Sequence, residues 1–247
     1  MSEQAPPIES VARAVRRQAR EELTRRIVET ARAQRASGGA ASLSLRAVAR
    51  ELGMVSSAVY RYVPSRDDLL TLLIIEAYDS LGAVAERAEA RVHRGDLDGR
   101  FRAVCHAVRR WAIRHPHEYA LIYGSPVPGY AAPADTVGPA SRVGMLLVEV
   151  LAAAVDSGRY PAPGVPSPEP SDAVRRAIAP IRSYLQTPVP DDLLVRGLIA
   201  WTHLFGAVSF ELFGHRHNVI ADPAGLREAF FDEEIRRIYT LIGIAPG

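Results

Sequence analysis

Apolar residues recur at the three- and four-residue spacing of α-helices along most of the chain, and no segment keeps the two-residue alternation of a β-strand. The pattern therefore predicts an all-α fold. Ser44 and Ser65 are good N-caps, and Asp222 with Pro223 forms a favourable start for the last helix. The expected helices cover about residues 15–36, 45–52, 56–63, 66–92, 101–115, 143–155, 172–185, 191–212 and 223–242, with an irregular loop over 123–136.

The composition is that of an ordinary globular protein. The chain has 247 residues, 48% of them apolar, and its single cysteine, Cys105, excludes a disulfide scaffold. The first ten residues lack the basic start and apolar run of a signal peptide. No apolar stretch is expected to reach the ~20 residues that cross a bilayer, since Glu149 interrupts Val143–Val155. We therefore expect a cytoplasmic protein that makes no membrane contact.

Positive charge is concentrated near the N-terminus. The net charge is only +2, yet residues 13–66 contain twelve arginines against four glutamates. Such a block favours a polyanionic partner, although arginines also cover ordinary solvated helix faces. Arg13, Arg16, Arg17 and Arg20 are expected to form an N-terminal arm that adds contacts to phosphate or the minor groove.

The basic region contains the spacing of a helix-turn-helix. Ala49 is small enough for two helices to cross closely, and Gly53, four residues on, can turn the chain sharply. If Val55, Val59 and Val63 face the core, the next helix points Ser57 and Arg61 outward, with Tyr62 nearer the core. A short, polar and cationic face of this kind suits the major groove of DNA.

The run SLRAVARELGMVSSAVYRYVPSRDDLL, residues 44–70, resembles the DNA-binding helices of the TetR family of bacterial transcriptional repressors. The likeness is dense from Glu21 to Leu70, with Val55 and Val63 as departures from the usual pattern. The resemblance implies DNA contacts from the second helix, from the recognition helix and from the start of the fourth helix. The implied DNA-binding residues are Ser44, Arg46, Ser56, Ser57, Ala58, Tyr60, Arg61, Tyr62 and Arg66.

Two later segments resemble the C-terminal regulatory domain of the TetR subgroup called WHG. They are HPHEYALIYGSPVPGY, residues 115–130, and WTHLFGAVSFELFG, residues 201–214. The resemblance implies a homodimer whose last two long helices pack with their mates as a four-helix bundle. Residues 194–212 are apolar all round, which agrees with such an interface, although burial inside a large monomeric core would explain the same pattern.

A regulatory domain of this type implies a small hydrophobic or amphipathic effector. Aromatic side chains and one histidine on the later helices are the candidates to bind it, with ordinary core packing as the alternative. The predicted ligand-binding residues are Trp111, Tyr123, Trp201, His203 and Phe205.

No pattern indicates catalysis, a cofactor or a metal site. The histidine pairs 115/117 and 215/217 lack metal-ligand spacing, and Cys105 lies on a stripe typical of core filler.

The resulting hypothesis is a one-component transcription regulator that acts as a repressor, with activation as the alternative within this class. Residues 1–66 are expected to form the arm and helix-turn-helix domain, and residues 67–247 the ligand-binding and dimerisation domain, joined by the long fourth helix. The dimer would bind a pseudopalindromic operator and be released when an effector shifts that helix. The alternative is a helical ligand carrier or enzyme that does not use DNA.

Overall fold

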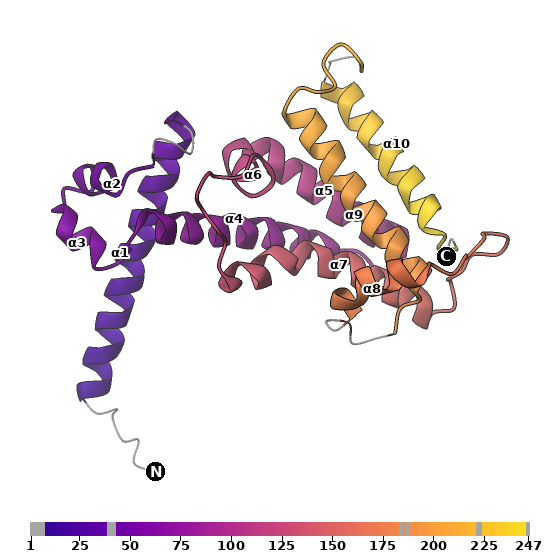
Figure 1. Cartoon of the computed structure of the whole chain (residues 1–247), viewed down its shortest axis with the longest axis horizontal. Coiled ribbons are helices and arrows are strands. Elements are labelled where there is room, and N and C mark those ends of the chain that lie inside the picture. Colours follow the sequence, from indigo (N-terminus) through magenta and orange to yellow (C-terminus); the bar gives the residue numbers. More distant parts are fainter. Residues whose placement is uncertain (1–7, 39–42, 183–184, 186–187, 221–223, 246–247) are drawn as a thin grey trace. The chain divides into compact units, whose positions relative to one another are not determined.

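The computed structural model describes residues 8–38, 43–182, 185, 188–220 and 224–245. Over this part of the chain it consists of helices and connecting turns without any strand, which confirms the predicted all-α fold (Figure 1). The helices are α1 (Ile8–Gly38), α2 (Leu45–Glu51), α3 (Ser56–Tyr60), α4 (Arg66–Glu89), α5 (Leu97–Arg114), α6 (Pro116–Tyr123), the 3-10 turn η2 (Ala134–Thr136), α7 (Val137–Asp156), α8 (Asp172–Arg182), α9 (Asp191–Leu212) and α10 (Ala224–Ile242).

Several helix boundaries differ from expectation. The stretch from Arg13 to Arg20, predicted as an N-terminal arm, is an exposed part of α1, because its Ala, Arg and Gln residues are good helix formers. Helix α6 was not expected. Pro116 was interpreted as the end of the preceding helix, whereas it also starts the next one, where its missing N–H costs nothing. The expected cap at Asp222 and Pro223 lies outside the described residues.

The chain divides into two compact units. Unit 1 comprises Met1–Glu76 with Ser125–Thr136, and unit 2 comprises Ala77–Gly124 with Val137–Gly247. The division falls within α4 rather than before it, where residue 66 was expected to end the first domain. Leu69 and Leu70 are fully buried but lie outside the core cluster of unit 2, which begins at Ala77.

Unit 1 is built around the small helices of the basic region. Helix α1 contacts α2, and α2 contacts α3. Ile27 of α1, Val48 of α2 and Val59 of α3 are all fully buried, as helical spacing predicts. Ala49 is 1% exposed, which confirms that a small side chain stands where the helices approach closely.

The turn between α2 and α3 is a Schellman motif. Gly53 has φ +66°, its N–H donates to the Arg50 carbonyl at 3.2 Å, and the Met54 N–H donates to the Ala49 carbonyl at 2.8 Å. Glycine adopts this left-handed conformation without the steric penalty that a Cβ brings. The backbone at Gly53 therefore sets the direction in which the chain enters α3.

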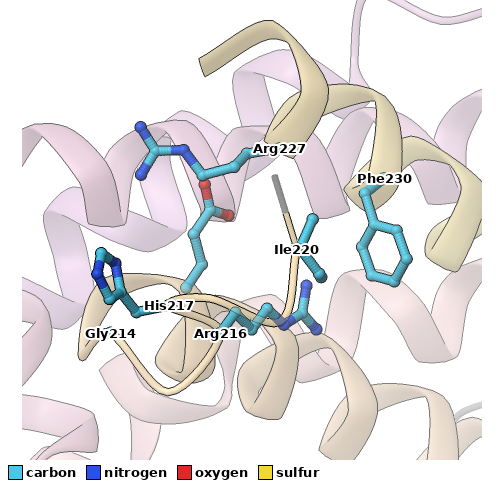
Figure 2. A pocket seen from close by; sticks show the side chains of 7 residues that line it. Gly214, Arg216, His217, Ile220, Arg227 and Phe230 are labelled. Carbon is cyan, nitrogen blue, oxygen red and sulfur yellow. The ribbon is translucent and has the colours of Figure 1, made fainter. Parts of the chain in front are cut away.

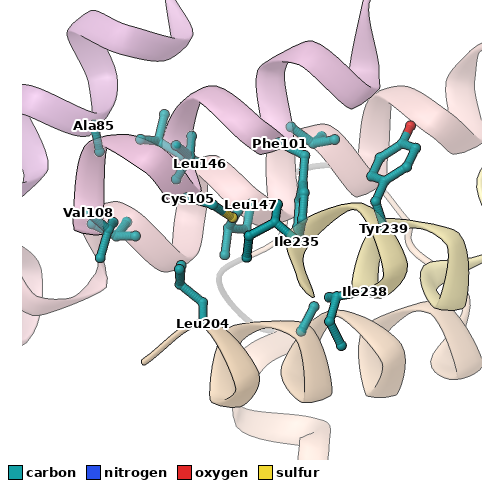
Figure 3. Packing of buried hydrophobic residues seen from close by; sticks show 14 of the residues in the cluster. Ala85, Phe101, Cys105, Val108, Leu146, Leu147, Leu204, Ile235, Ile238 and Tyr239 are labelled. Atoms are coloured by element: carbon teal, nitrogen blue, oxygen red, sulfur yellow. The ribbon is translucent and has the colours of Figure 1, made fainter. Parts of the chain in front are cut away.

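Unit 2 is a larger helical bundle in which α5 contacts α7, α9 and α10, and α9 also contacts α7 and α10. Figure 3 shows the Cys105 sulfur packed among apolar side chains that include Leu147 and Ile235. Cys105 is fully buried, which confirms its role as core filler, and burial raises the pKa of its thiol far above the usual range.

Two helical segments have the length and apolar composition of a membrane span. They are Ala134–Asp156 and Asp191–Leu212, each with a mean hydropathy of 1.5, so the exclusion based on stretch length was wrong. Glu149 is a single charged residue, so it does not bring the mean hydropathy of the whole helix below that of a membrane span. Neither helix argues for insertion, because the buried sides of both pack into the bundle of unit 2.

We predict that Gly53→Ala destabilises the chain by about 1–2 kcal/mol, because a Cβ at positive φ is strained even though nothing lies within 4 Å of it. Urea denaturation measures the loss. Gly138→Ala is the matched control, since that glycine is helical and also has open space around a Cβ. A loss of stability equal to that of Gly138→Ala would contradict the role of the turn.

Candidate nucleic-acid interface and effector cavity

Helix α3 begins at Ser56, as predicted, but the valine that precedes it does not face the core. Val55 is the N-cap, with φ −70° and ψ 139°, and it makes no side-chain capping hydrogen bond. Its side chain is 71% exposed, so the prediction that it faces the core was wrong. The backbone of Val55 is still extended, and side chains follow the 100° helical step only from Ser56 onward. The helical spacing to Val59 therefore does not apply to Val55.

The predicted orientation of the other α3 residues is confirmed, although the helix ends at Tyr60 rather than at Val63. Val59 and Val63 are fully buried, and Ser57 and Arg61 are exposed on the opposite face. The helix is short, since Arg61 is already its C-cap, but the Val63 N–H still donates to the Val59 carbonyl at 3.0 Å. We refer to the predicted contact residues as the α3 surface. Of these, Ser57, Tyr60, Arg61 and Arg46 are exposed, and Ser44, Ser56, Ala58, Tyr62 and Arg66 are partly buried.

Contacts with α1 hold this surface in place. The Arg20 guanidinium lies 5.5 Å from the centre of the Tyr62 ring, and its Nη2 donates to the Arg61 carbonyl at 3.4 Å. These contacts use the Arg61 backbone and leave its guanidinium free to project outward. Tyr62 has its ring against Arg20, in agreement with its predicted place nearer the core.

Caps fix the helices on either side. The Ala47 N–H donates to Ser44 Oγ at 3.4 Å at the start of α2, so Ser44 caps the helix from which Arg46 projects. At the start of α4 the Asp68 N–H donates to Ser65 Oγ at 3.0 Å. Arg66 is partly buried, and its Nη1 lies 4.0 Å from Asp67 Oδ1. The described residues provide no ion pair for Arg46 or Arg61 (both exposed), so this surface presents cationic groups to solvent.

Unit 2 contains a cavity of about 410 Å³. Its walls come mainly from α7 and α9, and no charged side chain occurs among the described residues that line it. Gly144 leaves room beside the Trp201 indole, and a Cβ at Gly197 would collide with Leu151. The lining residues are Phe101, Val137, Ala140, Ser141, Gly144, Met145, Leu147, Val148, Leu151, Ile181, Leu194, Gly197, Leu198, Ala200, Trp201 and Ile242.

The five predicted ligand-binding residues do not converge on this cavity, and of them only Trp201 lines it. Tyr123 stacks on Phe205 with ring centres 4.1 Å apart, so each ring fills the space beside the other. Trp111 is 3% exposed and its indole N–H donates to Ser80 Oγ at 3.0 Å. The other lining residues on α7 and α8 were missed, because periodicity does not reveal which apolar faces surround an empty space.

His203 lies on the side of α9 that faces α10. Its Nε2 is buried, makes no hydrogen bond to the described residues and is 3.7 Å from Glu234 Oε1. The Arg216 guanidinium binds both Glu234 oxygens, at 2.7 and 2.6 Å. His203 is thus next to an ion pair rather than at the apolar cavity.

A smaller pocket, about 70 Å³ in volume, lies at the turn between α9 and α10. Figure 2 shows Arg216, His217 and Ile220 on the turn, with Arg227 and Phe230 projecting from α10. The guanidinium carbon of Arg216 also lies over the Phe230 ring, 5.3 Å from the ring centre. A hollow of this size holds a few water molecules but not an effector. Within the described part of the chain no three ligating side chains gather around a possible metal position.

Two family sequence models match the chain. One, described as "Bacterial regulatory proteins, tetR family", matches residues 27–73. The other, described as "Tetracyclin repressor-like, C-terminal domain", matches residues 101–238. The latter description does not specify the WHG subgroup, which stays a prediction.

Individual relatives match over nearly the whole chain. The HTH-type transcriptional regulator Rv1816 of Mycobacterium tuberculosis is 41% identical over 231 residues, which are 92% of this chain and 95% of that protein. The regulator Mb1846 of Mycobacterium bovis matches to the same extent. Among solved structures, SCO4313 is 32% identical with a TM-score of 0.72 and covers 91% of this chain and 98% of its own. A protein from Rhodococcus sp. RHA1 shares the fold at 24% identity, with a TM-score of 0.62 and coverages of 90% and 95%.

Proposed function

The chain belongs to the TetR family of bacterial regulatory proteins, and from this premise we propose that it is a cytoplasmic repressor that binds a pseudopalindromic operator as a homodimer and leaves it when an effector binds. The observation that carries the proposal is the α3 surface, where Ser57 and Arg61 are exposed opposite the buried Val59 and Val63.

The side chains on this surface fit two tasks. Arg61 and Ser57 have the donors and acceptors that read base edges in the major groove. Arg46, Tyr60 and Arg66 can bind phosphates, which fixes the register of α3 on the duplex without reading sequence. In a two-fold dimer the two copies of α3 would enter successive major grooves about 34 Å apart.

The proposed dimer interface is an apolar stripe on α9 and α10, two helices that pack side by side (Figure 1). Ile199 and Phe210 of α9 are 59% and 54% exposed, and Leu226 and Leu241 of α10 are 53% and 66% exposed. Large apolar side chains at helical spacing are unfavourable in water, and pairing with the same stripe of a second copy would bury them.

The proposed effector site is the cavity of about 410 Å³ in unit 2. Its apolar lining favours an uncharged, largely apolar molecule, since a buried charge would have no partner there. Helix α4 carries residues of both units, with Leu70 in unit 1 and Leu81 in unit 2. A shift of α4 on effector binding is the proposed route from cavity to operator, and a coupling of about 1–3 kcal/mol suffices.

We predict that Arg61→Ala weakens operator binding by about 1–3 kcal/mol and relaxes base preference, while binding to random duplex changes less. Fluorescence anisotropy with the DNA that flanks the chain's own gene measures both. An equal loss on operator and random DNA would exclude base reading by Arg61. Operator affinity should also fall steeply with salt, whereas a ligand carrier that does not use DNA would show no such dependence.

Phe210→Glu should convert the dimer into a monomer, because two buried carboxylates would face each other across the two-fold interface. Sedimentation equilibrium gives the mass. Val174→Glu on α8 is the control, since Val174 is exposed but lies outside the stripe. A Phe210→Glu protein that stays dimeric would place the interface elsewhere.

Val148→Phe should fill part of the apolar cavity and weaken binding of N-phenyl-1-naphthylamine, an uncharged dye that fluoresces in apolar sites, by about tenfold or more. Glu149→Phe adds the same ring at the neighbouring exposed position and should leave dye binding unchanged. In the wild-type protein the dye should also lower operator affinity. Dye binding that is insensitive to Val148→Phe would remove this cavity as the effector site.

A further inference from the structure

A second hollow in unit 2 has the opposite chemistry. It lies between α4 and α5, has a volume of about 260 Å³ and has Trp111 in its floor together with small apolar side chains. Its rim is formed by four exposed arginines, Arg87, Arg91, Arg110 and Arg114. We name it the arginine groove. None of the described residues that line it is acidic.

The arginines of this groove differ from most others in the same unit. Arg100 pairs with Glu89, Arg109 binds both oxygens of Glu211, and Arg142 binds Glu86 and Asp79. For the four rim arginines the described part of the chain supplies no hydrogen bond or ion pair. Arg176 on α8 is the one further arginine of unit 2 for which the described residues supply no hydrogen bond or ion pair. Unit 2 therefore neutralises arginines in most places but gathers unneutralised ones along one groove.

Helix ends explain part of this arrangement. Arg87 and Arg114 lie in the last turns of α4 and α5, where the negative end of the helix dipole favours a cation. This effect does not bring Arg110 and Arg91 to the same groove, and like charges placed close together repel one another. A bound anion would remove that repulsion.

We propose that the arginine groove binds a compact multivalent anion of the phosphate class, such as the polyphosphate chain of a nucleotide or a free polyphosphate. Guanidinium groups present planar pairs of donors that match phosphate oxygens, and several such pairs around one hollow favour several charges on one molecule. The volume of about 260 Å³ suits a short polyphosphate chain. This site is separate from the apolar cavity, and its ligand binding does not depend on the proposed repressor function.

The test is isothermal titration calorimetry of the full chain with tripolyphosphate, ATP, AMP and sulfate. We expect tripolyphosphate and ATP to bind at least about tenfold more tightly than AMP or sulfate, because they offer more charges to the four guanidinium groups. Equal affinity for tripolyphosphate and ATP would assign recognition to the phosphate chain alone. Tighter binding of ATP would assign part of it to the nucleoside. Either result supports the site.

The double variant Arg87→Gln/Arg110→Gln should weaken tripolyphosphate binding by at least about tenfold. Arg176→Gln removes a comparable exposed arginine outside the groove and should leave binding unchanged. Both changes are at the surface, and circular dichroism checks that the helices persist.

Three results would overturn the proposal. The first is the absence of tripolyphosphate binding at millimolar concentration, and the second is an equal loss in Arg176→Gln. The third is a double variant that loses affinity for random duplex DNA as strongly as for tripolyphosphate, because the groove would then be a contact for the DNA backbone. Operator binding without any anion is measured separately, so failure of this site and failure of the repressor hypothesis are distinguishable.

Discussion

Burial of Val59 and Val63 determines what unit 1 can present to a partner. Both side chains are fully buried, and helical geometry then leaves Ser57 and Arg61 on the outer face of α3. The left-handed backbone at Gly53 decides where α3 starts and hence which residues obey this geometry. A small apolar contact and one backbone conformation thus position the polar groups that we assign to DNA.

Empty space in unit 2 arises where small residues face large ones. Tyr123 and Phe205 stack on each other, so their rings close the space between α6 and α9. Beside Trp201 the facing residue is Gly144, which has no side chain to fill the gap. Core and cavity are therefore built from the same apolar residue types, and the size of the facing side chain distinguishes them.

Local patterns in the sequence predict the fold better than the site. The long helices and the turn at Gly53 follow from spacing and from the conformational freedom of glycine, which act within a few residues. The prediction that Val55 faces the core was wrong, and the helix that starts at Pro116 was not predicted. Both residues lie at helix boundaries, where the sequence pattern does not show whether a valine or a proline belongs to the helix or to the turn beside it. The cavity could not be predicted, since Met145 and Ile181 meet there only after helices far apart in sequence have packed.

The pairing of arginines separates structural surfaces from binding surfaces in this chain. The chain has 30 arginines and no lysine, so charge alone does not distinguish one use from another. A guanidinium that binds a carboxylate of its own chain, as Arg109 binds Glu211, has its planar donors occupied. Arg61 on α3 and Arg110 in the arginine groove have no such carboxylate among the described residues. Their donors remain available to an external anion, and the neighbours of each favour a different one: a duplex at Arg61, which we propose to lie on the recognition helix, and a compact anion in the small groove at Arg110.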